Sequence, residues 1–134
     1  MSSIILRATA RPLVAILAII SIFVLLRGHD APGGGFIGGL LLTGGLALHL
    51  VAFGSRATAR AVRLEPLSIT AGGLLMVVIA AVVPLVQGDE LLQAQWWFAI
   101  PHVAKVGTVL IFDIGVYLVV VGTALLILLT LAEE

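Results

Sequence analysis

Residues 106–132 read VGTVLIFDIGVYLVVVGTALLILLTLA, an apolar stretch interrupted by a single carboxylate, Asp113. A helix rises about 1.5 Å per residue, so roughly 20 apolar residues are enough to cross the hydrocarbon core of a bilayer. This stretch exceeds that length and contains no basic residue. We therefore predict that it forms a transmembrane helix.

Three further apolar stretches precede it, at about residues 5–27, 33–54 and 67–87. The first is long enough only if its helix begins before Pro12, which membrane helices tolerate when neighbouring groups satisfy the freed carbonyl. Of the 134 residues, 61% are hydrophobic and 10% are charged, whereas soluble domains carry about 25% charged residues. We predict an all-α membrane protein in which residues 1–134 form one domain, a bundle of four transmembrane helices.

The charge and cysteine content excludes several classes of function. Seven basic residues balance seven acidic residues, so no nucleic-acid partner is expected. The chain has no cysteine, which excludes disulfide bonds, thiolate metal sites and a cysteine nucleophile. The three histidines show no metal-ligand spacing, and no pair of carboxylates shares a face within a span. We therefore expect no enzyme activity, no cofactor and no bound metal.

The positions of the basic residues predict the orientation. Two arginines precede the first span and three lie between the second and third, whereas Arg27 and Lys105 lie on the opposite side. The five are Arg7, Arg11, Arg56, Arg60 and Arg63. Because short loops rich in basic residues stay inside the cell, both termini are predicted to be cytoplasmic. An alternative treats the first span as a cleaved signal peptide, but no small-x-small cleavage site precedes Arg27.

The longest connection, residues 88–101, lies on the predicted outer side. Residues 89–98 read DELLQAQWWF, a pattern typical of a short amphipathic helix on the membrane surface. Trp96 and Trp97 suit the headgroup level, where an indole ring keeps its N–H group in contact with water. We expect these rings to anchor the chain rather than to bind a ligand.

The segment that leads into the second span is rich in glycine. Residues 27–39 read RGHDAPGGGFIGG, and small residues recur there every four positions. The residues of this motif are Gly34, Gly35, Gly38, Gly39 and Thr43. Such stripes let membrane helices approach closely, so we expect the motif to pack against a partner. One alternative is a partly unwound helix that lines an ion path. A phosphate cradle is disfavoured, because no strand precedes the glycines and no Gly-Lys-Ser/Thr follows.

Two stretches resemble the signatures of a known family. Residues 28–39 closely resemble the signature of the B-type (MnhB/MrpB-like) subunits of the Mrp-type multisubunit cation/proton antiporters, and residues 112–118, FDIGVYL, resemble that family's second signature. The first match includes Gly28, His29, Asp30, Pro32, Gly33 and Phe36. The two matches occur in the family's order and alongside four spans. The resemblance covers most of the chain and is weakest over residues 88–105.

The resemblance implies an accessory subunit of a bacterial or archaeal cell-membrane complex. Such a complex uses the proton gradient to exchange a monovalent cation, expected to be sodium, for protons. The implied partners are the other Mrp subunits, of which the large ones resemble antiporter-like subunits of respiratory complex I. Contacts with membrane lipid, monovalent cations and protons are also implied. Two alternatives remain open: a purely structural docking subunit that carries no ion, and the related membrane subunit of an energy-converting hydrogenase.

Few ionisable residues lie within or beside the predicted spans, and these are candidates for an ion path. Asp113 lies about 10 Å below the outer end of the fourth span, and His49 lies in the inner half of the second. Because charge is costly in hydrocarbon, each should face protein or water. Tyr117, one turn after Asp113, is placed to donate a hydrogen bond to it. Lys105, two turns before Asp113, is about 12 Å away along the axis.

These candidates also have structural interpretations. For Asp113 an inter-subunit hydrogen bond that holds an assembly together is favoured over an ion site, and for His49 a packing role with its ring nitrogens satisfied is favoured. One acid and one histidine within four spans are too few for a self-contained antiporter. This scarcity favours an accessory role in a larger complex.

Overall fold

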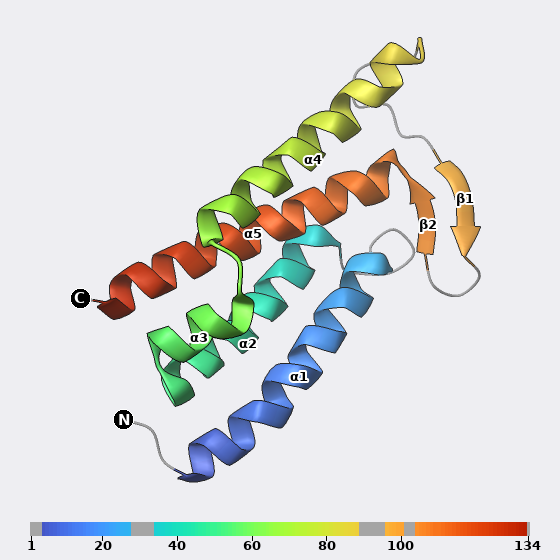
Figure 1. Cartoon of the computed structure of the whole chain (residues 1–134). Coiled ribbons are helices and arrows are strands. Elements are labelled where there is room, and N and C mark those ends of the chain that lie inside the picture. The colour runs from blue at the N-terminus through green and yellow to red at the C-terminus, as the bar shows by residue number, and fades with distance from the viewer. Residues whose placement is uncertain (1–3, 28–33, 89–95, 101–103, 134) are drawn as a thin grey trace.

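The computed structural model describes residues 4–27, 34–88, 96–100 and 104–133 (Figure 1). Its elements, in chain order, are α1 (Ile4–Leu26), α2 (Gly35–Phe53), α3 (Ser55–Val62), α4 (Pro66–Val86), β1 (Trp96–Ile100), β2 (Ala104–Gly107) and α5 (Thr108–Glu133). Helices α1, α2, α4 and α5 are long and apolar enough to cross a membrane. The predicted bundle of four transmembrane helices is therefore confirmed.

The four long helices pack in an order that differs from their order in the chain. Helix α4 packs along α5, α5 packs on α2, and α2 packs along α1. Figure 1 shows the two ends of the chain at the same end of the bundle as α3, whereas the β1–β2 hairpin lies at the opposite end. This arrangement is the one that four successive membrane crossings produce. The core forms where α1, α2 and α5 meet, around Leu25, Tyr117 and Val121.

The contact between α4 and α5 depends on glycine. A Cβ atom added to Gly73 would lie 2.6 Å from the carbonyl oxygen of Gly115, and one added to Gly115 would lie 2.7 Å from that of Gly73. Further along the same pair of helices, a Cβ added to Gly122 would collide with Thr70. The two backbones are therefore in direct contact, which only small residues permit in membrane helices.

The outer connection corrects one prediction. Residues 96–100 form β1, which pairs antiparallel with β2, so they do not continue an amphipathic helix. The register joins Ile100 to Ala104 and Phe98 to Val106. Aromatic and β-branched residues favour strands, and Pro101 disfavours the helical conformation at the residue before it. Residues 89–95 of the expected helix lie outside the described residues.

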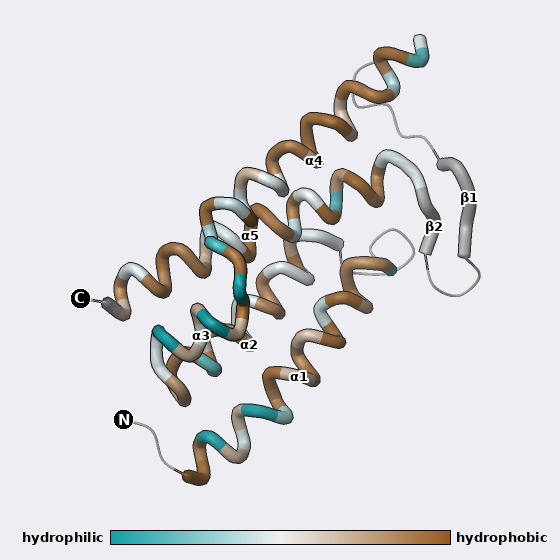
Figure 2. Tube along the Cα trace, viewed as in Figure 1, coloured by the Kyte–Doolittle hydropathy of each residue, from teal (hydrophilic) through white to brown (hydrophobic). Residues whose placement is uncertain are grey.

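The short helix α3 is an addition to the predicted elements. Gly54, with φ of 91°, ends α2 and turns the chain into α3, and Arg63 closes α3 in the left-handed conformation with φ of 66°. Arg56 and Arg60 are exposed on one face of α3, whereas Thr58 on the other face is fully buried. Figure 2 shows hydrophilic residues gathered on α3 and on the first half of α1, at one end of an otherwise apolar bundle. This pattern is typical of a helix that lies at a membrane surface.

Reporter fusions test the predicted orientation of this bundle. A reporter fused at Arg60, within α3, should lie in the cytoplasm, and one fused at Gln93 should lie outside, because five of the seven basic residues lie on the α3 side. Alkaline phosphatase, which is active only outside the cytoplasm, and green fluorescent protein, which folds only inside it, give complementary signals. Finding both fusion sites on one side of the membrane would contradict the four-span topology.

Candidate functional site

Tyr117 lies at the centre of the bundle, where it joins α5 to α1. Its hydroxyl oxygen is 2.8 Å from Ser21 Oγ, and its side chain is 8% exposed. Ser21 Oγ in turn donates to the carbonyl of Ala18 at 2.7 Å. Because a hydroxyl has one proton to donate, Tyr117 is the donor to Ser21. The hydrogen bond expected between Tyr117 and Asp113 is therefore replaced by one between α5 and α1.

Asp113 is half-buried on α5 and faces the first turn of α2. A Cβ added to Gly34 would lie 4.0 Å from Asp113 Oδ2, and one added to Gly35 would collide with the Asp113 carbonyl oxygen. Gly34 has φ of 111°, and its N–H donates to the carbonyl of Val24 at 3.0 Å, so the end of α1 fixes the start of α2. The N-terminus of a helix carries partial positive charge, which attracts a carboxylate. Asp113 thus lies where three helices of the bundle converge.

His49 lies at the opposite end of α2 and joins it to α3. Its Nδ1 atom is 2.7 Å from Oγ1 of the fully buried Thr58. Its ring packs against Phe53 with the ring centres 4.7 Å apart, and the guanidinium of Arg11 lies 5.2 Å from the Phe53 ring centre. These contacts connect α1, α2 and α3.

The candidates for an ion path are not brought together in one place. Asp113 lies beside Gly34, and His49 is 15 residues further along α2, a separation of about 22 Å along the helix axis. The Tyr117–Ser21 pair lies between them, one turn from Asp113. Lys105 lies in β2, where its Cα pairs with that of Ala99, outside the helices that cross the membrane. The residues proposed for the path therefore form a widely spaced series rather than a cluster.

The glycine motif contacts helices of the same chain. Beyond the clash at Gly35, a Cβ added to Gly39 would lie 2.9 Å from the Cβ of Val120 on α5, and one added to Gly38 would lie 2.8 Å from the Ser21 carbonyl on α1. Thr43 Oγ1 donates to the Gly39 carbonyl at 2.8 Å. The surface that we expected to meet a partner is therefore occupied by α1 and α5.

The remaining residues of the first signature lie mostly outside the described part of the chain. Phe36 is described, in the first turn of α2, and its side chain is 58% exposed. The signature residues for which no placement is described are Gly28, His29, Asp30, Pro32 and Gly33.

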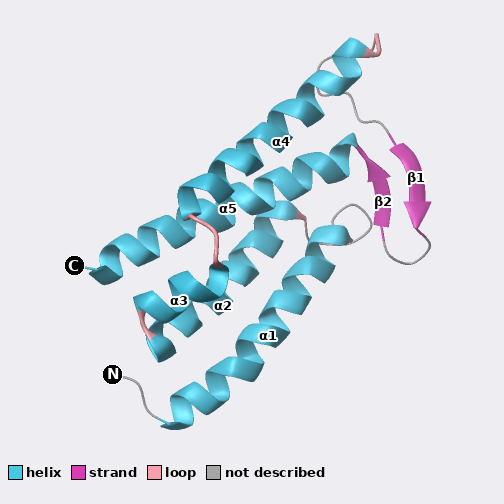
Figure 3. Ribbon diagram, viewed as in Figure 1, coloured by secondary structure: helices cyan, strands magenta, loops and turns pink. Residues whose placement is uncertain are grey.

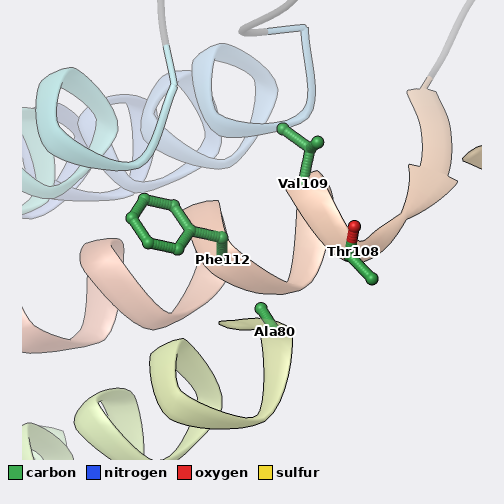
Figure 4. Close-up of a pocket in the computed structure, with 4 residues that line it drawn as sticks. All are labelled: Ala80, Thr108, Val109 and Phe112. Atoms are coloured by element: carbon green, nitrogen blue, oxygen red, sulfur yellow. The ribbon is translucent and has the colours of Figure 1, made fainter. Parts of the chain in front are cut away.

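Two cavities lie near the candidate residues. One, of about 220 Å³, lies between α4 and the first turns of α5 and is lined by Ala80, Thr108, Val109 and Phe112 (Figure 4). Asp113 follows Phe112 in the chain but faces α2, on a different side of α5. The other cavity, of about 370 Å³, extends between Tyr117 and His49 and is otherwise lined by apolar side chains. The lining of the second cavity is apolar apart from Tyr117 and His49, so it offers few partners to ordered water.

Ser21 and Thr58 are the polar partners that sequence reasoning missed. Both are fully buried, and each is hydrogen-bonded to a candidate residue: Ser21 to Tyr117, and Thr58 to His49. A hydroxyl within an apolar helix is the signal that points to Ser21, because such side chains form hydrogen bonds between membrane helices. Thr58 gives no such signal, since it lies in a charged connection whose helical structure is not apparent from sequence.

Figure 3 shows a mainly helical framework with one hairpin, and this framework has known counterparts. The profile of a domain related to the MnhB subunit of Na+/H+ antiporters matches residues 5–126. The chain is 35% identical to the B subunit of a Na(+)/H(+) antiporter of Alkalihalophilus pseudofirmus, over 99% of this chain and 94% of that protein. It is 37% identical to the Na(+)/H(+) antiporter B subunit of Bacillus subtilis, over 94% of this chain and 91% of that one.

A solved structure has the same fold. The structure of the Mrp complex from Dietzia sp. DQ12-45-1b superposes with a TM-score of 0.77 and 33% sequence identity over 94% of this chain. The chain spans 14% of the length of the chain that it matches there. The four-helix unit described above therefore also occurs as part of a much longer polypeptide.

Proposed function

The chain belongs to the family of domains related to the MnhB subunit of Na+/H+ antiporters, and we propose that it is an accessory subunit of a multisubunit antiporter. The proposed complex exchanges a monovalent cation, which we take to be sodium, for protons across a bacterial cell membrane. The observation that carries this proposal is the match over residues 5–126, combined with four helices able to cross a membrane. We also propose that residues 1–134 act as one domain.

The scarcity of ionisable groups supports an accessory role. Among the described parts of the four long helices, Asp113 and His49 are the candidates for carrying ions, and about 22 Å of helix separates them. The cavity between Tyr117 and His49 is lined almost entirely by apolar side chains. The main route for cation and proton is therefore assigned to other subunits, with Asp113 as the contribution that we propose for this chain.

The surface of the bundle supports partnership with other subunits and with lipid. Between 17 and 28% of the apolar window of each spanning segment is buried within the chain. The rest of this apolar surface needs hydrocarbon or other membrane helices around it, because it cannot face water. We propose that the other antiporter subunits, including the large ones that resemble subunits of respiratory complex I, cover part of it.

Omitting this chain from the complex tests the proposed function. All subunit genes are expressed in a host without its own sodium/proton antiporters, with or without the gene for this chain. We expect sodium-dependent proton exchange in everted vesicles to be lost without the chain and restored when it is supplied separately. A tag on one of the large subunits reports whether the complex forms. Exchange that persists without this chain, or purification of the chain with hydrogenase subunits instead, would contradict the proposal.

A further inference from the structure

The larger of these two cavities runs along one half of the bundle and is partly open at the surface. Its volume is about 370 Å³, within the range of pockets that bind small molecules. Helices α1 and α5 contribute Val14, Ala18 and Val121 to its lining, α2 contributes Leu46, and α3 contributes Val62. Ala61 lines it too, so α3, which Figure 1 shows crossing in front of α2, bounds one end of the cavity.

The two polar side chains that line this cavity already have hydrogen-bond partners. His49 Nδ1 pairs with Thr58 at 2.7 Å, and the Tyr117 hydroxyl pairs with Ser21 at 2.8 Å. The other lining side chains are apolar. A water molecule needs two to four polar partners to be held in a buried site, so this cavity suits hydrocarbon rather than water.

The length of the cavity is about two thirds of the hydrocarbon thickness of one leaflet. Its lining on α2 extends from Leu42 to His49, about 10 Å along the helix axis. Half of the hydrocarbon core of a bilayer is about 15 Å thick. The cavity begins at the α3 end of the bundle and ends beside Tyr117, so it extends through most of the leaflet on the α3 side. This is the depth and direction that a single acyl chain occupies.

Positive charge lies at the end of the cavity that α3 closes. Arg11 is one turn before Val14 on α1, and its guanidinium lies 5.2 Å from the ring of Phe53, which itself packs on His49. Arg63 lies between two lining residues, Val62 and Leu64. Both arginines are exposed, so their guanidinium groups are accessible at the membrane surface. A guanidinium binds phosphate oxygens through two parallel hydrogen bonds, which makes it well suited to a lipid headgroup.

We propose that this cavity binds one acyl chain of an anionic phospholipid from the leaflet on the α3 side, with Arg11 and Arg63 holding its phosphate group. The charge balance supports this occupant. At this end of the bundle five arginines outnumber three acidic residues, Glu65, Glu133 and Glu134. An anionic headgroup relieves the repulsion among these arginines, and its acyl chain fills an apolar space that water does not. This inference concerns lipid binding alone and does not depend on the transported cation.

Photolabelling of the assembled complex tests the proposal. The purified complex is placed in nanodiscs of phosphatidylcholine that contain a small fraction of phosphatidylglycerol with a diazirine in its acyl chain. After illumination, the labelled peptides are identified by mass spectrometry. We expect the label to concentrate on the cavity-lining segments of α1, α2 and α5. The same diazirine carried by phosphatidylcholine should label these segments less.

Matched variants separate the headgroup from the acyl chain. Arg11→Gln and Arg63→Gln should each lower phosphatidylglycerol labelling about fivefold, as expected when one basic residue near an anionic surface is lost. Arg56→Gln is the control, because it removes the same charge from the α3 surface at a position five residues from the nearest lining residue of α3, Ala61, whereas Arg63 adjoins two lining residues. Ala18→Phe should fill the cavity and abolish the labelling, whereas Ile19→Phe, on an exposed position of the same helix, should leave it unchanged.

The comparison of the two lipid probes uses the wild-type complex and therefore needs no variant to fold. Equal labelling of the cavity by phosphatidylglycerol and phosphatidylcholine would overturn the preference for an anionic lipid. Absence of label from the cavity segments would overturn the site itself. The site would also be overturned if a photoreactive amino acid placed at Val14 captured another protein of the complex instead of lipid.

Discussion

Replacing Gly35 with leucine is expected to break the contact between α2 and α5 and to prevent assembly of the complex. A Cβ atom at this position would collide with the backbone carbonyl of Asp113, and it would also lie 3.1 Å from the backbone nitrogen of Tyr117. Backbone atoms of two packed helices cannot move aside as the end of a side chain can. Overpacking a core costs about 1–3 kcal/mol where side chains adapt, so we expect an effect at or above the upper end of this range.

The matched control is Gly44→Leu on the same helix. A Cβ added to Gly44 meets no atom within 4 Å in the described structure, and the residue is exposed. Leucine is favourable in a membrane helix, so this variant should insert and assemble normally. The measurements are the amount of each variant in the membrane and the amount that purifies with a tagged partner protein. Normal recovery of the complex with Gly35→Leu would show that the α2–α5 contact does not limit assembly.

The glycine motif illustrates how far sequence reasoning extends. Small residues at intervals of four predict that another backbone approaches closely, and the contacts of Gly35, Gly38 and Gly39 agree with that physical reason. The pattern does not specify which helix approaches. The identity of that helix depends on the packing order of α1, α2 and α5, which arises from all the interfaces together and leaves no signal at the glycines themselves.

Tyr117 illustrates the same limit at the level of one hydrogen bond. Helical spacing puts it one turn after Asp113, so proximity to that carboxylate is predictable. Its actual partner, Ser21, is 96 residues away in the chain and is brought close by the packing of α1 beside α5. Local periodicity contains no information on a contact of this separation. The four spans were predictable because apolar length is a property of the chain alone, whereas β1 and α3 depend on local propensities that the long apolar pattern obscures.

Asp113→Asn is expected to reduce cation-dependent proton exchange about tenfold or more while the complex still assembles. A tenfold loss corresponds to about 1.4 kcal/mol of activation free energy, a small part of the cost of moving an ion past a site that has lost its charge. Asparagine keeps the shape of the side chain and one acceptor oxygen, so packing against Gly34 and Gly35 should be little disturbed. What it removes is the negative charge and the ability to take up and release a proton.

The structural interpretation of Asp113 makes the opposite prediction. The carboxylate lies at the first turn of α2, where the end of α1 fixes the start of that helix through the Gly34–Val24 hydrogen bond. If Asp113 only stabilises this junction, asparagine still accepts hydrogen bonds there and exchange continues. Asp113→Glu provides the complementary test, because it keeps the charge but moves it by about one methylene group. We expect Glu to keep part of the activity that Asn loses.

Everted vesicles allow exchange and complex abundance to be measured on the same samples, which separates the two interpretations of Asp113. Tyr117→Phe is the control for disturbance of the bundle, because it removes the hydrogen bond to Ser21 at a cost of about 1 kcal/mol and leaves the carboxylate in place. Exchange per assembled complex should therefore fall with Asp113→Asn and stay near normal with Tyr117→Phe. Normal exchange by the Asn variant, or parallel loss of exchange and complex, would assign Asp113 to holding the junction of α1, α2 and α5. Loss of exchange in an intact complex would mean that the carboxylate itself takes part in moving the ion.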